Sequence, residues 1–215
     1  MIVYDPFETV PLSNFTPEVI VATGDIPSDM AESYIRQAVI DFAHRSQVVR
    51  RKLWVDLQAC VGDYLIEPPK CEQIVSIQRI CGGDGCLSFT PIADEPCCAH
   101  LPCCGGGVVW FVPPYTINID PTPVNDVCRA LFVDASVAPS RDACEVDRIY
   151  YDRFHEAIIN GALYRLFLIK GTAWYDPNVA LAYKGLYDTS VAAGGVERLM
   201  GFQRGRIKLH GARIV

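Results

Sequence analysis

The sequence predicts an α+β protein, built as a small antiparallel α-helical bundle with an inserted antiparallel β domain and an extended C-terminal arm. Three observations indicate this fold. Apolar residues recur every three or four positions on both sides of the middle third of the 215-residue chain, which is the spacing of one helix face. The middle third instead has short runs of alternating apolar and polar residues, as strands do. The last residues combine glycines with basic side chains and show neither pattern.

Composition and periodicity divide the chain into four parts. Residues 1–27 contain prolines and threonines without periodicity and are expected to form an extended lead-in. Residues 28–50 and 145–195 are expected to form one discontinuous helical domain, and residues 51–144 an inserted β domain with a cysteine-rich loop. Residues 196–215 are expected to form an extended C-terminal arm. The helices must pack together, because their apolar stripes would otherwise stay in contact with water.

The first helix is predicted between Pro27 and about Gln47. Asp29 and Glu32 have the spacing of a capping box, with Asp in place of Ser or Thr at the cap. An apolar stripe at helical spacing makes the helix amphipathic. This stripe consists of Ala31, Ile35, Ala38, Val39 and Phe42.

Short strands are predicted throughout the inserted part. Gly82-Gly83-Asp84-Gly85 has the composition of a hairpin turn between two of them. Residues 91–107 contain three prolines, two cysteine doublets and three consecutive glycines, so we expect a long loop there. The predicted strands are residues 52–58, 64–66, 74–80, 87–89, 108–112, 116–119 and 130–137.

One helix is expected to organise the rest of the chain. It begins after Asp147, a predicted N-cap, and ends before Gly171. It has small residues at positions 157, 161 and 162, which let a second helix approach closely. The helix is therefore predicted to be central in the bundle. Its predicted inner face consists of Tyr150, Phe154, Ala157, Ile158, Gly161, Ala162 and Arg165.

The last helix is predicted to start at Asp176 and Pro177, an N-cap followed by proline at the first helical position. Gly194 and Gly195 are expected to end it. Its apolar stripe is predicted to contain Leu181, Gly185, either Leu186 or Tyr187, and Val191.

The net charge of −6 argues against a general nucleic-acid binder. The charge is uneven, because the segment from Arg198 to the end has five basic residues and no acidic one, which leaves −11 on the first 197 residues. This asymmetry suggests a tail that reaches another surface, and the alternative is a terminus that only contacts solvent. No run of about 18 apolar residues is present, so no membrane helix is expected. The first residues lack the features of a signal peptide, which favours synthesis in a cytoplasm.

No catalytic residue, cofactor or metal site is predicted. His155-Glu156 begins like a zinc-protease motif, but Ile159 stands where the second histidine would be, so His155 is expected on the polar face of its helix. Ten cysteines lie between Cys60 and Cys144. Three states remain open for them: zinc thiolates, disulfides formed in a finished extracellular particle, and free thiols that pack as small apolar groups. The last of these is the one we expect.

Four motifs, taken in order along the chain, resemble a known family. They are Phe42-x3-Ser46-x3-Arg50, Gly62-Asp63-Tyr64-Leu65-Ile66-Glu67-Pro68, Tyr151-x4-Glu156-Ala157-Ile158-Ile159-Asn160-Gly161-Ala162-Leu163-Tyr164-Arg165-Leu166, and Ala173-Trp174-Tyr175-Asp176-Pro177-x2-Ala180-x2-Tyr183. This order resembles the head-to-tail adaptor proteins of tailed bacteriophages, in particular the tail tubular protein A type of short-tailed phages. The resemblance covers about residues 28–192, and the cysteine-rich loop at 81–104 departs from it.

The resemblance implies a structural virion protein rather than an enzyme. Such adaptors assemble as a homo-oligomeric ring, usually twelvefold, under the portal vertex at the head–tail junction. The ring is the channel through which double-stranded DNA passes without specific binding, and the platform for tail nozzle or tail fibre proteins. The implied location is the virion, after assembly in the cytoplasm of the bacterial host, with no membrane partner.

The resemblance also implies that the C-terminal segment extends onto the portal protein. Its residues agree with this role, because glycines disfavour a helix, apolar side chains can fill pockets, and arginines can pair with an acidic surface. The predicted portal-binding residues are Phe202, Arg204, Arg206, Ile207, Lys208, Leu209, Arg213, Ile214 and Val215.

Two other functions remain open. One is a metal-binding or hydrolytic virion enzyme that uses the cysteine-rich loop, and the other is a small binding module with no role in the virion. Stoichiometric zinc, lost together with an activity when Cys97, Cys98, Cys103 and Cys104 are replaced by serine, would favour the enzyme. A stable monomer that ignores the portal would favour the binding module.

Because no metal is expected to hold the fold, we predict that excess EDTA leaves the melting temperature unchanged. The measurement is a thermal melt followed by circular dichroism, with and without chelator. A drop of several degrees would instead show that metal binding contributes to folding.

Overall fold

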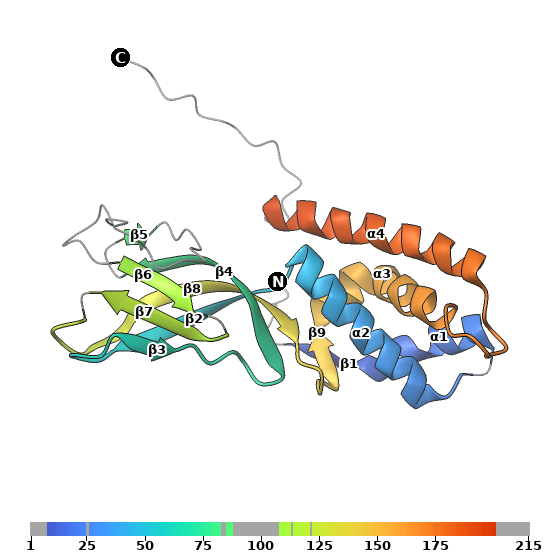
Figure 1. Ribbon diagram of the computed structural model, residues 1–215, viewed down its shortest axis with the longest axis horizontal. Helices are drawn as coiled ribbons and strands as arrows, with labels where there is room; N and C mark the ends of the chain where they lie inside the picture. The colour runs from blue at the N-terminus through green and yellow to red at the C-terminus, as the bar shows by residue number, and fades with distance from the viewer. Residues whose placement is uncertain are drawn as a thin grey trace, which may run out of the picture.

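Helices lie at one end of the molecule and most strands at the other (Figure 1). We describe the chain from a computed structural model, over residues 8–24, 26–82, 85–87, 108–112, 114–120 and 122–200. The α+β prediction is confirmed within these residues, where four α-helices accompany three antiparallel sheets. The predicted arm from residue 201 onward lies outside the described residues.

Helix α3 (Arg148–Leu166) is in the middle of the helical part, in contact with α1 (Thr16–Thr23), α2 (Ser28–Ser46) and α4 (Pro177–Leu199). Its central position, predicted from its small residues, is confirmed. The predicted inner face is also the buried one, although Arg165 is only partly buried. Its buried residues are Tyr150, Phe154, Ala157, Ile158, Ile159, Gly161, Ala162, Leu163 and Leu166.

Gly161 lies at a close contact between helices of the bundle. A Cβ atom placed on this glycine would lie 2.6 Å from Cε2 of Tyr187 in α4 and 3.0 Å from Cβ of Ala38 in α2. No real side chain fits at the first distance, so glycine is required for the two neighbouring helices to approach as they do. The Tyr187 ring is fully buried there, and its hydroxyl donates to the carboxylate of Asp41 at 2.8 Å, with the carbonyl of Ala38 at 3.1 Å.

Two predicted helix starts are confirmed, and one predicted cap is wrong. The Asp147 carboxylate accepts from the backbone N–H of Ile149 at 2.9 Å, and the Asp176 carboxylate accepts from two N–H groups at the start of α4. Helix α2 begins at Ser28 after Pro27, which caps it without a side-chain hydrogen bond. The predicted Asp29–Glu32 capping box is therefore absent, because Asp29 already lies inside the first turn.

Helix α4 differs from its prediction at its end and on its faces. It continues through Gly194 and Gly195 to Leu199, so residues 196–199 belong to the helix and not to the arm. Gly194 is buried, and its Cβ position lies 3.1 Å from the Phe42 ring, so packing favours the helix despite the intrinsic cost of glycine. The predicted stripe is right for Tyr187 and Val191, whereas Leu181 and Leu186 are exposed.

The strands form three antiparallel sheets with orders β2-β8-β4-β5, β3-β7-β6 and β1-β9. Six of the seven predicted strands are present, with bounds that agree or differ by a few residues, and of the predicted strand 87–89 only Leu87, in β5, lies within the described residues. The β4–β5 hairpin is confirmed by the pairing of Ile80 with Leu87, whereas the loop predicted at 91–107 lies outside the described residues. The bounds are β1 (Thr9–Pro11), β2 (Arg50–Leu57), β3 (Asp63–Leu65), β4 (Glu72–Gly82), β5 (Gly85–Leu87), β6 (Val108–Val112), β7 (Thr116–Asp120), β8 (Val127–Pro139) and β9 (Glu145–Asp147).

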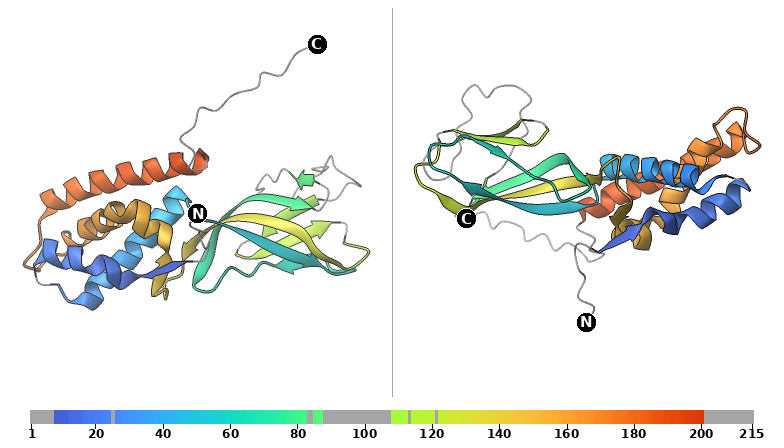
Figure 2. Two further views of the ribbon diagram at one scale, coloured as in Figure 1. Left: turned by 180° about the vertical axis from the view of Figure 1, so that it is seen from behind. Right: turned by 90° about the horizontal axis from the view of Figure 1, so that it is seen from below.

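Strand β8 passes through both hydrophobic cores of the molecule. Val137 and Ala138, near its end, are buried in the helical core, and Val133, earlier in the strand, is buried in the core of the β part. The yellow strand accordingly runs from the sheets toward the helices (Figure 2). The two parts are therefore joined by a continuous strand with buried side chains, and not by a free linker.

The extended lead-in predicted for residues 1–27 is wrong for residues 9–23. This segment forms strand β1, a 3₁₀ helix (Leu12–Phe15) and helix α1. Leu12, Phe15 and Val19 are fully buried in the helical core. Helix α1 has only eight residues, too few to show a periodic stripe, and its stability comes from tertiary packing. No helix among the described residues is long and apolar enough to cross a membrane.

We predict that Gly161→Ala lowers the free energy of unfolding by about 1–3 kcal/mol, because its Cβ overlaps the buried Tyr187 ring. The measurement is urea unfolding followed by circular dichroism. The matched control is Gly195→Ala in α4, where no atom lies within 4 Å of the added Cβ and alanine should stabilise by about 0.5–1 kcal/mol. Equal effects of the two substitutions on the free energy of unfolding would refute the close approach of the Tyr187 ring to Gly161.

Candidate functional site at the junction of the helical and β parts

The predicted portal-binding residues, from Phe202 to Val215, all lie outside the described residues, so their contacts stay predictions. The structure does place the end of α4, which directly precedes them in the chain. Arg198, in the last turn of α4, donates to the side-chain oxygen of Gln47 at 2.9 Å, and Gln78 of β4 donates to the same oxygen at 3.1 Å. The end of α4 is therefore held beside the point where helices and sheets meet (Figure 1).

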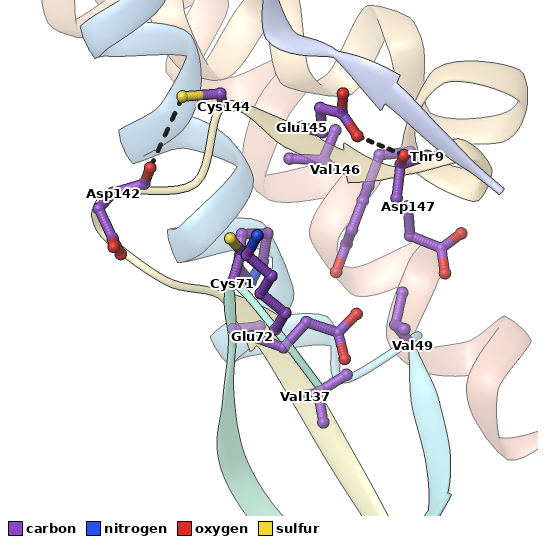
Figure 3. Close-up of a pocket in the computed structure, with 14 residues that line it drawn as sticks. Thr9, Val49, Cys71, Glu72, Val137, Asp142, Cys144, Glu145, Val146 and Asp147 are labelled. Atoms are coloured by element: carbon purple, nitrogen blue, oxygen red, sulfur yellow. Dashed lines mark hydrogen bonds between the residues drawn. The ribbon is translucent and has the colours of Figure 1, made fainter. Parts of the chain in front are cut away.

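A cavity of about 350 Å³ lies at this same junction, between the start of β4, the end of β8, and strands β1 and β9. Figure 3 shows Cys71, Asp142 and Cys144 on one side of the cavity, and Thr9, Glu145 and Asp147 on the other. The lining is mainly acidic and apolar. It consists of Thr9, Val49, Lys70, Cys71, Glu72, Val137, Ala138, Pro139, Asp142, Cys144, Glu145, Val146, Asp147 and Tyr150.

Two carboxylates of this lining share one guanidinium group. Arg51 of β2 donates to Glu72 of β4 at 2.7 and 3.2 Å and to Asp147 at 2.7 Å. The three side chains are only 10%, 16% and 11% exposed, so they have little access to water. Burial raises the pKa of Glu72 above its usual value even though Arg51 lowers it. The group therefore ties β2, β4 and the start of α3 together in a partly dehydrated site.

Asp147 has two roles in this arrangement. One carboxylate oxygen caps α3 and the other accepts from Arg51. The first turn of α3 is therefore connected directly to strand β2 of the largest sheet. We call Arg51, Glu72 and Asp147 the junction triad. Sequence analysis missed it because its members are 21 and 75 residues apart and no local pattern links them.

The buried phenol of Tyr150 lines the cavity next to the junction triad. Its hydroxyl has no hydrogen-bond partner among the described residues. Burial, followed by the nearby carboxylates of Asp147 and Glu72, raises the pKa of Tyr150 well above its usual value. It therefore stays neutral at physiological pH and is not a phenolate nucleophile.

The cysteines that can be placed do not pack as the sequence suggested. Cys60, Cys71, Cys128 and Cys144 are free thiols with exposed side chains, so the expectation of buried apolar packing is wrong for these four. They lie in turns and near strand ends, where no core is available. No group of three or more potential metal ligands occurs in the part of the chain that the structure describes. The side chains of the cysteine doublets lie outside that part.

His155 does not lie on a solvated polar face as predicted. Its ring stacks on Phe15 at 5.0 Å and meets Tyr151 edge-on at 4.8 Å, and its Nε2 lies 2.8 Å from a carboxylate oxygen of Glu18. His155 therefore links α3 to α1 and the preceding 3₁₀ helix. This contact could not be predicted, because the segment around Phe15 was expected to be an extended lead-in.

A comparison with protein families matches residues 12–206 to the family described as "SU10 adaptor protein". The chain belongs to the SU10 adaptor protein family. The matched residues include all four helices and every described strand except β1. This establishes the resemblance to phage adaptors at the level of the family, and with it a structural role. No curated protein matches the chain.

In this SU10 adaptor family member, the junction triad acts as a structural brace. Its charges are paired and its members sit on three different elements, so it holds the helical and β parts in one orientation. Such a structural site agrees with membership of an adaptor family.

We predict that Arg51→Met lowers the free energy of unfolding by about 3–5 kcal/mol, because two buried carboxylates lose their counter-charge. Adding Glu72→Gln and Asp147→Asn should restore much of the loss, since Asn still caps a helix. Acidification should also reduce the difference in free energy of unfolding between the Arg51→Met variant and the native chain. The reason is that protonation removes the unpaired charge of Glu72. Denaturant unfolding at pH 5 and pH 8 measures both effects. If the two added substitutions leave the loss of unfolding free energy unchanged, the junction triad does not act as a brace.

Proposed function

We propose that the chain is the head-to-tail adaptor of a tailed phage, of the tail tubular protein A type found in short-tailed phages. A homo-oligomeric ring, with twelve copies as the expected number, lies between the portal and the tail nozzle. Double-stranded DNA passes through the ring, which also serves as the platform for nozzle or fibre proteins. The observation that carries this proposal is the family match from residue 12 to residue 206, which spans both parts of the fold and reaches the basic C-terminal residues.

The distribution of charge supports a conduit. The first 197 residues carry −11, and an acidic lumen repels phosphates and lets a duplex slide. A basic lumen would instead hold DNA through salt-dependent contacts. An acidic chain is therefore expected to bind DNA weakly, which suits the passage of a genome better than a DNA-binding role.

The C-terminal residues supply the contact with the portal. Residues 201–215 contain four of the five basic residues that follow residue 197, and they contain no acid. Their arginines can form bidentate pairs with carboxylates on the portal, and their apolar residues can enter pockets. The hydrogen bond from Arg198 to Gln47 supports this role, because it fixes the end of α4, from which residues 201–215 follow.

The β part supplies a second surface, away from the helices, to which nozzle or fibre proteins can attach. Its two larger sheets have their own core and project from the helical part (Figure 1). The junction triad and strand β8 connect this part to the helices. Separate surfaces for the portal and the tail are what an adaptor between two assemblies requires.

We predict that deleting residues 201–215 leaves the circular dichroism spectrum unchanged but abolishes co-sedimentation with the portal ring of the same phage. Replacing Arg204, Arg206 and Arg213 with serine should weaken binding and reduce its salt dependence, because three charged contacts are lost. The matched control is Arg141→Ser, an exposed cation in the described part of the chain. Unchanged portal binding after the deletion would refute the assignment of the arm.

A further inference from the structure

The outward side of α4 is an uncharged apolar ridge. The side chains of Leu181, Leu186, Val196 and Leu199 are 67%, 56%, 54% and 74% exposed. Their spacing places them on the side of the helix opposite the buried residues, including Tyr187. We call this outward side the α4 ridge. It consists of Leu181, Ala182, Gly185, Leu186, Thr189, Ala192, Ala193, Val196, Leu199 and Met200.

The α4 ridge has the features of a contact surface. Its helix has 23 residues, which corresponds to a length of about 34 Å. The charged residues of α4 all lie outside the ridge. Gly185 has no atom within 4 Å of its Cβ position, so the middle of the ridge allows another backbone to approach closely. Monomeric proteins rarely leave a continuous apolar surface of this kind in water.

A second apolar surface lies on the other side of the helical part. It is a groove of about 550 Å³ along α1, and we call it the α1 groove. Pro17, Ile20 and Val21 form its apolar lining, and Val21 is 82% exposed. Small hydroxyl side chains and Glu32 complete the groove. Helix α3 lies between α1 and α4 in Figure 1, and α1 packs against α2 and α3.

We infer that the α4 ridge of one copy packs into the α1 groove of the next copy, and that this contact closes the ring. The inference rests on the proposed function, which requires a ring, and it adds the two surfaces that form it. A contact between two different surfaces of the same chain is heterologous, and repetition of such a contact generates a ring. A ridge paired with itself would give a twofold dimer and leave the α1 groove uncovered.

Polarity and charge favour a second copy as the occupant. Ridge and groove are both nearly uncharged, so each can cover the other without burying an unpaired charge. At the edges, Lys184 beside the α4 ridge is paired with Asp188 of its own helix at 2.8 Å, and Glu32 at the α1 groove is paired with Arg36 at 3.7 Å. The charges that border the contact are therefore neutralised within each copy. DNA offers no apolar surface for the ridge.

The test uses the full-length chain, alone and mixed with the portal ring, and counts copies per complex by native mass spectrometry. Leu186→Glu and Val21→Lys should each weaken ring formation by about tenfold or more, because each places a charge in an apolar contact. The matched control is Val124→Glu, at an 84% exposed valine in the β part, which should leave the ring intact. Circular dichroism verifies that each variant is folded.

Mixing the two single variants provides the sharper measurement. The glutamate on α4 of one variant then faces the lysine on α1 of the other, and the remaining contacts are native, so rings should form again. Rings formed by Leu186→Glu alone as well as by the native chain would overturn this inference and leave the proposed function standing. A native chain that forms no ring, with or without the portal, would overturn both.

Discussion

The contact between Gly161 and the ring of Tyr187 is the constraint on which the arrangement of the helices depends. It allows α3 and α4 to approach closely enough for the Tyr187 side chain to reach α2, where its hydroxyl meets Ala38 and Asp41. Arg165 completes this contact by pairing with Asp41 at 3.1 Å. A single tyrosine therefore fixes three helices relative to one another. Its position also directs α4 so that the end of this helix meets the β part.

The link between the two parts follows from this arrangement. Strand β8 contributes buried side chains to both hydrophobic cores, and the junction triad joins β2 and β4 to the start of α3. The proposed adaptor role requires force to be transmitted between two binding surfaces. A buried brace and a shared strand transmit force better than a flexible linker, because neither can extend without breaking packed contacts.

The parts of the fold that sequence analysis predicted are those with strong local signals. Asp147 and Asp176 precede helices as caps, and the strands alternate over several residues. Helix α1 was missed because it is too short for a visible stripe, and Leu181 was placed inside because α4 is apolar on both sides. The junction triad could not be predicted, since only the tertiary fold brings Arg51 to its partners. The motifs predicted a phage adaptor, which the match to the SU10 adaptor protein family supports, whereas the tail tubular protein A type and the portal-binding role of the arm stay predictions.

The most direct measurement is electron microscopy of the full-length chain bound to the portal ring of its phage. The account predicts a coaxial ring of this protein on the portal, with α4 of each copy against α1 of the next. Density for residues 201–215 should then extend onto the portal surface. A folded protein that leaves the portal bare, or that binds it only as isolated copies without contact between neighbours, would contradict the account.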